Sequence, residues 1–376
     1  MVNAQMIIQL LTELAPHSYA YDWDNVGVQA GSLDTEINKV LLSLDINSKV
    51  LNEAENKNCN MIISHHPVIF DDINSINDQN PTGKLLIEAI KKSILLYSAH
   101  TNLDVANGGL NDYLGKLLKI DNLKPLSIKE KNQLYKLVIF GPKENLNEIR
   151  NKILKESTAK IGNYSSTSYS TIGEGTFKAE KGSNPYIGKK GEITEVEEFR
   201  LETIVKDSDI NKILRIVNKV HPYEEVAYDL FKLENNIELG NIALGRIGEL
   251  DSSKKLIDYA NFVKEKLDLS YLKYHGNASE QIKKVAFCSG SGADLIAKAK
   301  YSGADLYITG DVKYHEAQYA EELNLNLIDA GHYGTEAIVK DLFYEFFNKK
   351  AKEKNYNVEF IKSTINSNPW KYIWQF

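Results

Sequence analysis

Two stretches of this 376-residue chain follow the same alternation of short apolar strands and amphipathic helices. In the first stretch the predicted strands are residues 40–46, 61–66 and 94–99, and the predicted helices are residues 49–58 and 84–92. In the second stretch the predicted strands are residues 285–292, 305–311 and 326–330, and the predicted helices are residues 293–302 and 315–323. Strands that are apolar along their whole length favour a sheet that helices cover on both faces. The pattern therefore predicts an α/β fold.

We interpret the two stretches as pseudo-symmetric halves of one domain; the alternative is chance agreement between two ordinary strand–helix–strand patterns. Aligned by pattern, His65-His66 corresponds to Gly310-Asp311, and His100 to Asp104 corresponds to His332 to Glu336. All of these residues end or follow predicted strands, and open α/β sheets bind ligands beyond the carboxyl ends of their strands. A paired arrangement of the halves would therefore bring the polar residues of both together.

The segment between the halves has a different pattern. Its predicted elements are a strand at 133–140, a helix at 143–156, strands at 173–177 and 192–204, a helix at 208–220 and a strand at 226–233. This βαββαβ order is typical of the ferredoxin-like α+β sandwich. We therefore predict an inserted domain over residues 126–244, between core halves at 1–125 and 245–376. Asn235-Asn236 and Asn241 to Leu250 mark the return to the core.

Composition excludes several classes of protein. No run approaches the roughly 18 apolar residues of a membrane helix, and a net charge of -6 gives no basis for nucleic-acid binding. The N-terminal residues lack the basic start of a secretory signal and have the pattern of an amphipathic helix, which predicts a cytoplasmic protein. Only Cys59 and Cys288 occur, far apart and beside predicted buried strands. A disulfide framework or a thiolate zinc site is therefore not expected.

Histidines and carboxylates are the remaining candidates for metal ligands. A divalent ion held by such side chains needs three or four ligands from separate segments, and the chain offers His65, His66, Asp104, His332 and Glu336. His332 and Glu336 are four residues apart, so a helical turn would present both on one face. Five ligands exceed one tetrahedral site. Two metal ions about 3.5–4 Å apart and bridged by a carboxylate would use them all.

Each of these residues also has a purely structural interpretation. His65-His66-Pro67 could form a turn after a strand, and His100 could be a core histidine bonded to the backbone. His332 and Glu336 could belong to a helix start, where the helix dipole favours an acid. However, five of the eight histidines lie at or just after predicted strand ends, at positions 65, 66, 100, 315 and 332. Independent structural roles do not explain that concentration, so we favour the metal site.

Four other motifs have weaker chemical interpretations. His315 is a candidate catalytic proton carrier beside a metal-activated water, although it could simply begin a helix. Ser289 to Gly292 could bind phosphate through backbone N–H groups, but it lacks the Walker lysine and the Rossmann spacing. Asp22 to Gly27 could cover the site or form an Asx-type turn. His221 to Asp229 could hold a second metal ion or form a rigid connection led by Pro222.

Five motifs together resemble the Nif-three-like dinuclear metal-centre family, whose members are called GTP cyclohydrolase I type 2 homologues. They are Trp23-Asp-Asn-Val-Gly27, Ser64-His-His-Pro67, His100-Thr-Asn-Leu-Asp104, Gly310-Asp-Val-Lys-Tyr-His315 and Gly331-His-Tyr-Gly-Thr-Glu336. The middle segment resembles the PII/CutA-like insertion of the long bacterial members. Ser289 and Val226 stand where relatives often have Gly and Pro, and neither is a proposed ligand.

The resemblance implies two divalent metal ions per subunit, with His65 and His332 on one, His66 and Asp104 on the other, and Glu336 between them. It also implies a homohexameric ring whose metal sites face an internal cavity. We expect zinc, with manganese or iron as alternatives. The expected activity is hydrolysis of a nucleotide such as GTP by metal-activated water, with Glu336 and His315 as catalytic residues. The alternatives are a non-enzymatic metal-dependent regulator or scaffold that uses the PII-like insertion, and a metal-binding chaperone.

Overall fold

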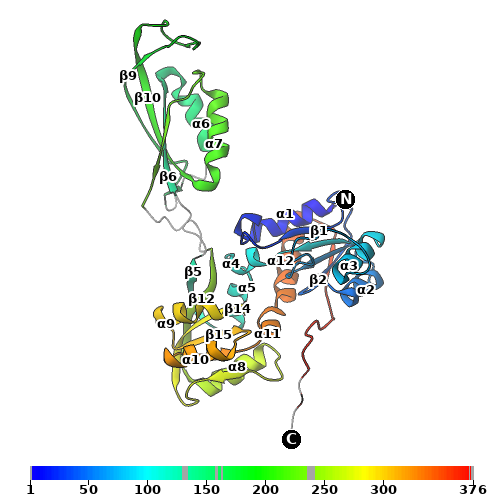
Figure 1. Cartoon of the computed structure of the whole chain (residues 1–376). Helices are drawn as coiled ribbons and strands as arrows, with labels where there is room; N and C mark the ends of the chain where they lie inside the picture. The colour runs from blue at the N-terminus through cyan, green and yellow to red at the C-terminus, as the bar shows by residue number, and fades with distance from the viewer. Residues whose placement is uncertain are drawn as a thin grey trace. The chain divides into compact units, whose positions relative to one another are not determined.

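A computed structural model describes residues 2–128, 134–156, 160–161, 164–234, 242–371 and 373. The chain forms two compact units: unit 1 is residues 1–129 with 241–376, and unit 2 is residues 130–240 (Figure 1). The sequence places the limits of the insertion at 126 and 244. Gln133, Asn235, Asn236 and Asn241, which belong to predicted elements or boundaries, lie outside the described residues.

The first sheet of unit 1 has the strand order β1-β4-β3-β2-β17. Its strands are β1 (Gly27–Ala30), β2 (Lys39–Ser43), β3 (Met61–Ser64), β4 (Leu95–Ser98) and β17 (Glu359–Lys362). All are parallel except β1, which is antiparallel to β4. Successive residues of a strand face opposite sides. Leu41 shares a core cluster with α2 (Ser48–Asn56) and α3 (Pro81–Lys91), whereas Leu42 packs with α1 (Ala4–Leu14) and α12 (Val339–Lys354). Helices therefore cover both faces, as predicted.

The second sheet of unit 1 has the strand order β13-β16-β15-β14-β12-β5. Its strands are β5 (Asp121–Ile128), β12 (Ala243–Lys255), β13 (Lys273–His275), β14 (Gln281–Ser291), β15 (Leu306–Gly310) and β16 (Asn326–Asp329). Only β14, β15 and β16 pair in parallel. One face packs with α9 (Ile296–Tyr301) and α10 (Tyr314–Glu322), and the other with α5 (Leu110–Leu117) and α8 (Leu256–Lys266). The predicted α/β class is confirmed for this sheet too.

The two halves of unit 1 share a strand order. The parallel strands run β4-β3-β2 in one sheet and β16-β15-β14 in the other. A five-residue helix follows the third strand of each half, α4 (Thr101–Val105) after β4 and α11 (His332–Glu336) after β16. The correspondence read from the sequence therefore extends to the order of the strands. The antiparallel strands β1, β5, β12 and β13 lie outside the predicted pattern.

One hydrophobic core joins the two halves. Ile63 and Tyr97 of the first sheet and Phe287 and Ile308 of the second belong to the same buried cluster, which α12 completes through Phe347. Burying such side chains contributes roughly 1.5–3 kcal/mol each. The strand ends of the two halves are therefore held at fixed positions relative to each other.

Unit 2 has the predicted order of elements. It contains β6 (Leu134–Pro142), α6 (Leu146–Glu156), β9 (Ser168–Lys178), β10 (Ile193–Lys206), α7 (Ile210–Val220) and β11 (Tyr228–Lys232), with a small hairpin of β7 (Lys160–Ile161) and β8 (Tyr164–Ser165). Its main sheet is antiparallel in the order β11-β6-β10-β9. Phe199 and Leu201 of β10 pack against Ile213 and Val217 of α7. Unit 2 thus has a core of its own.

Helix composition and the two cysteines can be compared with the sequence predictions. Among the described residues, no helix has the length and apolarity needed to cross a membrane. Cys59 and Cys288 are both buried and unpaired with each other. Burial raises the pKa of Cys59 to about 11 and holds that of Cys288 well above its usual value. Among the described residues, neither cysteine belongs to a group of side chains that could hold a metal ion.

Replacing Glu53 with glutamine is expected to destabilise unit 1. Glu53 in α2 is 9% exposed and accepts hydrogen bonds from Lys57, Ser363 and Thr364. Burial alone would raise its pKa, but these bonds lower it from 4.5 to about 2. A carboxyl group whose pKa is lowered by folding contributes its full stabilisation at pH values above its unfolded-state pKa. That contribution is lost as pH falls through the folded-state pKa. We expect a loss on the order of 2 kcal/mol at pH 7.

Thermal unfolding of Glu53→Gln and wild type at several pH values checks this expectation. The difference in Tm should be largest near pH 7 and should narrow as pH falls from 4.5 towards 2. Glu55→Gln is a matched control, because Glu55 lies in the same helix and its ion pair with Lys92 is at the surface, where such pairs contribute about 0–1 kcal/mol. Equal Tm values for wild type and Glu53→Gln at pH 7 would contradict the expectation.

Candidate metal centre

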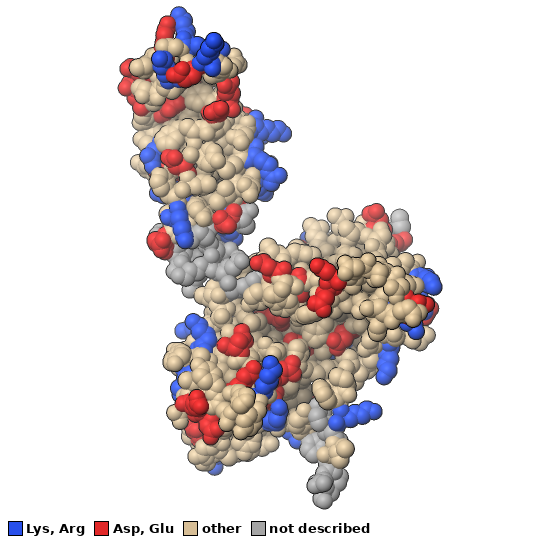
Figure 2. All heavy atoms as spheres, viewed as in Figure 1, with Lys and Arg blue, Asp and Glu red and all other residues tan. Residues whose placement is uncertain are grey.

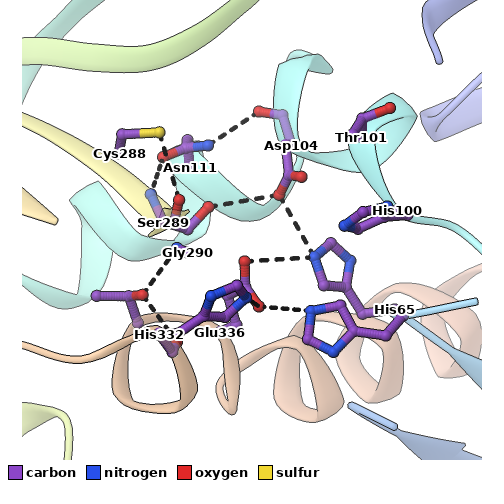
Figure 3. Close-up of polar contacts among 12 residues, drawn as sticks. His65, His100, Thr101, Asp104, Asn111, Cys288, Ser289, Gly290, His332 and Glu336 are labelled. Atoms are coloured by element: carbon purple, nitrogen blue, oxygen red, sulfur yellow. Dashed lines mark hydrogen bonds and ion pairs between the residues drawn. The ribbon is translucent and has the colours of Figure 1, made fainter. Parts of the chain in front are cut away.

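The five predicted ligands meet at the carboxyl ends of parallel strands in unit 1. His65 and His66 follow β3, Asp104 lies in α4, and His332 and Glu336 lie in α11. Figure 3 shows His65 of the first half directed at both Asp104 and Glu336, the latter from the second half. Among the described residues, three sets of side chains have ligand atoms within 4.8 Å of one another and could each hold a metal ion: His66-His332-Glu336, His65-Asp104-Glu336 and His65-His66-His100.

Glu336 faces two of these sets with different oxygen atoms. The Nε2 atoms of His66 and His332 each lie 2.9 Å from Glu336 Oε2. On the other side, His65 Nε2 lies 3.7 Å from Glu336 Oε1 and 3.6 Å from Asp104 Oδ1. The structure therefore groups the side chains differently from the pairing that the family resemblance implied: His66 lies with His332, and His65 lies with Asp104. The adjacent histidines reach different sets.

Each of the four clustered imidazoles has its Nδ1 atom next to an acceptor outside the cluster. The pairs are His65 with Ala99 O at 2.8 Å, His66 with Asp45 Oδ1 at 2.7 Å, His100 with Asp24 Oδ1 at 2.8 Å and His332 with Asp311 Oδ2 at 2.7 Å. Since a carbonyl or carboxylate can only accept, Nδ1 carries the hydrogen and Nε2 of the neutral ring keeps a lone pair. Acceptors behind histidines in this way are typical of metal sites.

Buried atoms without partners show that the cluster fits a cation. Among the described residues, His65 Nε2 and Glu336 Oε2 are buried and make no well-aligned hydrogen bond. The imidazole nitrogens 2.9 Å from Oε2 are close to it but are not oriented as donors. Leaving a buried polar atom unpaired costs about 1–3 kcal/mol. A divalent ion between imidazole and carboxylate would remove that cost.

Charge in the cluster shifts pKa values in opposite directions. Burial alone would raise the pKa of Glu336, but its interactions with His332, His65 and His66 hold it well below the ordinary value. Burial would lower the pKa values of His66 and His332, but the surrounding carboxylates raise them to about 10 and about 9. Protons on the imidazoles thus balance the charge of Glu336. A divalent cation would replace those protons.

His100 and the loop before β1 form one edge of the cluster. Asp24, whose side chain is fully buried, accepts hydrogen bonds from His100 Nδ1 and from the backbone and hydroxyl groups of Thr101. Trp23 lies edge-on to the His100 ring, with 6.0 Å between the ring centroids. His100 is therefore held by a carboxylate and not by the backbone. The segment Asp22 to Gly27 contributes to the site as well as forming a turn.

His315, the predicted proton carrier, lies apart from these contacts. It is near the start of α10, is exposed, and its Nδ1 atom lies 2.9 Å from Gln318 Oε1. Its ring lies edge-on to Tyr314. Among the described residues, none of the three candidate metal-binding sets includes it.

Two other sequence hypotheses do not fit the structure. The backbone N–H groups of Ser289, Gly290 and Gly292 already donate to Asn111, Thr335 and Thr309 within unit 1, so these three groups are not available to bind phosphate. In unit 2, His221 Nε2 donates to Phe140 O, and its Nδ1 accepts from Tyr223 N. His221 therefore has no free ring nitrogen for a separate metal site in unit 2. This favours the alternative that residues 221–229 form a rigid connection led by Pro222.

Three residues of the site were not predicted as such: Asp24, Asp45 and Asp311 behind the histidines. Asp45 and Asp311 follow the carboxyl ends of β2 and β15, where the ligand residues of neighbouring strands also lie. Asp24 precedes β1, whose antiparallel pairing with β4 brings its start to the same edge. The rule that located the ligands would have located Asp45 and Asp311 too, whereas Asp24 is brought to this edge only by the pairing of β1 with β4.

A cavity of about 750 Å³ opens beside His66 and His332. Its other walls are Leu44, Asp45, residues 267–271, Lys273, Asp311, residues 329–334 and the C-terminal residues 366–370. Lys273 is the only Lys or Arg among its described lining residues, and Lys273 Nζ lies 2.6 Å from Asp329 Oδ2. Figure 2 shows acidic side chains around the hollowed part of this face of unit 1. The protein itself therefore provides little free positive charge here.

Comparisons with known proteins agree over nearly the whole chain. A family model described as Duf34/NIF3 (NGG1p interacting factor 3) matches residues 2–369. The chain is 38% identical over 371 residues to a Halalkalibacterium halodurans protein and over 373 residues to a Bacillus subtilis protein, each named GTP cyclohydrolase 1 type 2 homolog, and both matches cover 99% of each chain. The fold is similar to the crystal structure of a Bacillus cereus protein related to NIF3, with a TM-score of 0.81, 35% identity and 99% coverage of each chain.

Proposed function

The chain belongs to the Duf34/NIF3 family, and from this premise we propose that it binds two divalent metal ions and hydrolyses a nucleotide or a related small molecule with metal-activated water. The observation that carries the proposal is the position of Glu336, whose two oxygens face separate sets of ligands. Imidazole and carboxylate ligands suit zinc, manganese and iron. We propose zinc, with the other two as alternatives.

The chain's own residues would have distinct roles in this reaction. When bound, two adjacent divalent ions supply Lewis-acid polarisation and lower the pKa of water. Glu336 would hold the two positions together, and the acceptors behind His65, His66 and His332 would fix the direction of each Nε2 lone pair. Because Lys273 is already paired with Asp329, an anionic substrate would bind mainly through the ions. Its remaining part would occupy the cavity.

Metal-reconstituted protein should release product from a nucleotide or phosphoester, with products identified by mass spectrometry. Ring opening of a purine nucleotide such as GTP at the imidazole C8 is the version that the names of the relatives suggest. Treatment with a chelator should abolish turnover, and returning zinc or manganese should restore it. Turnover that is unchanged in Glu336→Ala would identify a contaminating enzyme and refute the proposal.

We propose two histidines as candidates for the proton carrier, and one pair of variants separates them. His315 is the residue that the sequence suggested; it is exposed at α10. His100 lies in the cluster, and the buried carboxylate of Asp24 orients it, as a general base requires. We expect His100→Asn to lower kcat by about 10²–10⁴-fold and His315→Asn to have the smaller effect. The opposite ranking would assign the role to His315, and loss of metal from His100→Asn would make His100 a ligand.

Unit 2 motivates the alternative function. Its βαββαβ order and its sheet order β11-β6-β10-β9 support the proposal of a ferredoxin-like, PII/CutA-like insertion. A non-enzymatic, metal-dependent regulator would use that insertion to bind an effector or a partner. Saturable nucleotide binding at the insertion of the metal-loaded protein, together with no turnover of any tested substrate, would favour the regulator.

We also propose that the protein is a homohexamer in the cytoplasm, with the metal sites facing an internal cavity, as the family resemblance suggests. Light scattering on the purified full chain should give six chain masses for the native particle. A monomeric particle that retains full metal content and turnover would contradict the hexamer without affecting the metal site.

A further inference from the structure

The C-terminal segment, residues 363–370, begins beside β2, the strand that leads to Asp45 at the candidate metal centre. β17 pairs in parallel with β2, from Glu359 opposite Lys39 to Lys362 opposite Leu42. The pairing continues for one more bond, since Ser363 N donates to Leu42 O at 2.8 Å. The residues that follow β2 and those that follow β17 therefore leave the sheet at the same edge. The residues after β2 include Asp45, so the C-terminal segment is brought to the carboxylate that lies behind His66.

The segment is anchored before it reaches Asp45. Ser363 and Thr364 donate three hydrogen bonds to the carboxylate of Glu53, and Ile365 packs against the apolar cluster between the sheet and α2. Glu53 is itself buried and held in α2. These contacts fix the path of the chain up to Ile365, and Ser367 follows two residues later.

Asp45 is shared between the C-terminal segment and a metal ligand. Asp45 Oδ1 lies 2.7 Å from His66 Nδ1, and Asp45 Oδ2 accepts a hydrogen bond from the Ser367 hydroxyl. The Asp45 side chain is 34% exposed, so packing alone does not fix its orientation. We propose that Ser367 is a positioning residue for His66, acting through Asp45, and that the C-terminal segment thereby controls one of the two metal positions. This inference rests on the proposed metal-binding function.

The effect should be confined to the set His66-His332-Glu336. On the other side, His65 Nδ1 bonds to Ala99 O, and Asp104 belongs to α4. Neither makes a hydrogen bond to residues 363–370 in the part of the chain that the structure describes. The same segment also forms a wall of the cavity through residues 366–370. One segment therefore contacts both the support of a metal ligand and the space beside it.

Calorimetric titration of chelator-treated full-length protein with Zn²⁺ tests the proposal without using activity. In Ser367→Ala we expect the affinity for one of the two ions to fall at least about 10-fold. This is the lower end of the range for the loss of an outer-shell partner. Ser367→Thr retains the hydroxyl and should restore the affinity. Ser279→Ala is the matched control, because Ser279 makes the same kind of hydroxyl contact in an exposed turn with Asn277 and should leave both affinities unchanged.

Combining variants identifies which metal position Ser367 affects and whether it acts through Asp45. The weakening by Ser367→Ala should persist in an Asp104→Ala background and disappear in a His332→Ala background. It should also add little to the effect of Asp45→Ala, because Ser367 acts through that carboxylate. Unchanged affinities in Ser367→Ala, equal weakening of both ions, or full additivity with Asp45→Ala would each overturn the inference alone. A wild-type protein that binds no divalent ion would overturn the proposed function and this inference together.

Discussion

Replacing Glu336 with alanine is expected to remove both metal ions from the protein. Glu336 is 3% exposed and belongs to two of the candidate sets, which it faces with different oxygens. Its removal would leave His66 and His332 without their shared carboxylate, and His65 with Asp104 alone. We expect both affinities to fall by more than about 100-fold, the upper value for loss of an outer-shell partner, because Glu336 would itself be a ligand.

Metal analysis of the purified protein provides the measurement. Variants that each touch one set serve as matched comparisons: His332→Ala and Asp104→Ala should each lose one ion and keep the other. This outcome would also separate the observed grouping from the pairing that the family resemblance implied. Circular dichroism should be unchanged for all three variants. Wild-type metal content in both Glu336→Ala and His332→Ala would refute the site.

Replacing Gly290 with alanine is expected to impair metal binding without adding or removing a ligand. Gly290 follows Cys288 and Ser289 near the end of β14 and has a positive φ of 64°. A Cβ atom at this position would lie 2.2 Å from Glu336 Oε1 and 3.4 Å from His332 Nε2. The carboxylate would have to leave its place between the two sets. We expect at least about 10-fold weaker binding of both ions, on the scale of disturbed outer-shell contacts.

The control must separate the steric contact from backbone strain, since a left-handed conformation costs a non-glycine residue roughly 1–2 kcal/mol. Gly191 also has a positive φ, 82°, but a Cβ atom there would have nothing within 4 Å. Gly191→Ala should therefore show a comparable backbone cost and normal metal content. If Gly290→Ala binds both ions with wild-type affinity, Glu336 is not confined as the structure indicates.

Much of the fold could be predicted because its signals are local. Buried parallel strands such as Met61 to Ser64 are apolar throughout, and the helices between them have one apolar face, so a short window of sequence identifies both. Strand β17 had no such signal. It has only four residues, Glu359–Lys362, and its place beside β2 depends on pairing with residues more than 300 positions away. No local pattern encodes that pairing.

The sequence by itself indicated five of the residues that lie together in the candidate metal centre. In parallel sheets, a polar residue that follows an apolar strand must emerge at the carboxyl edge, so His65, His66, Asp104, His332 and Glu336 could be selected from their positions alone. Only the tertiary structure decided how they are grouped and which residues support them. Whether His66 faces His332 or Asp104, and whether Ser367 meets Asp45, depends on how the two sheets and the C-terminal segment pack around one shared core. Side-chain directions at a site built from distant segments are set by that packing.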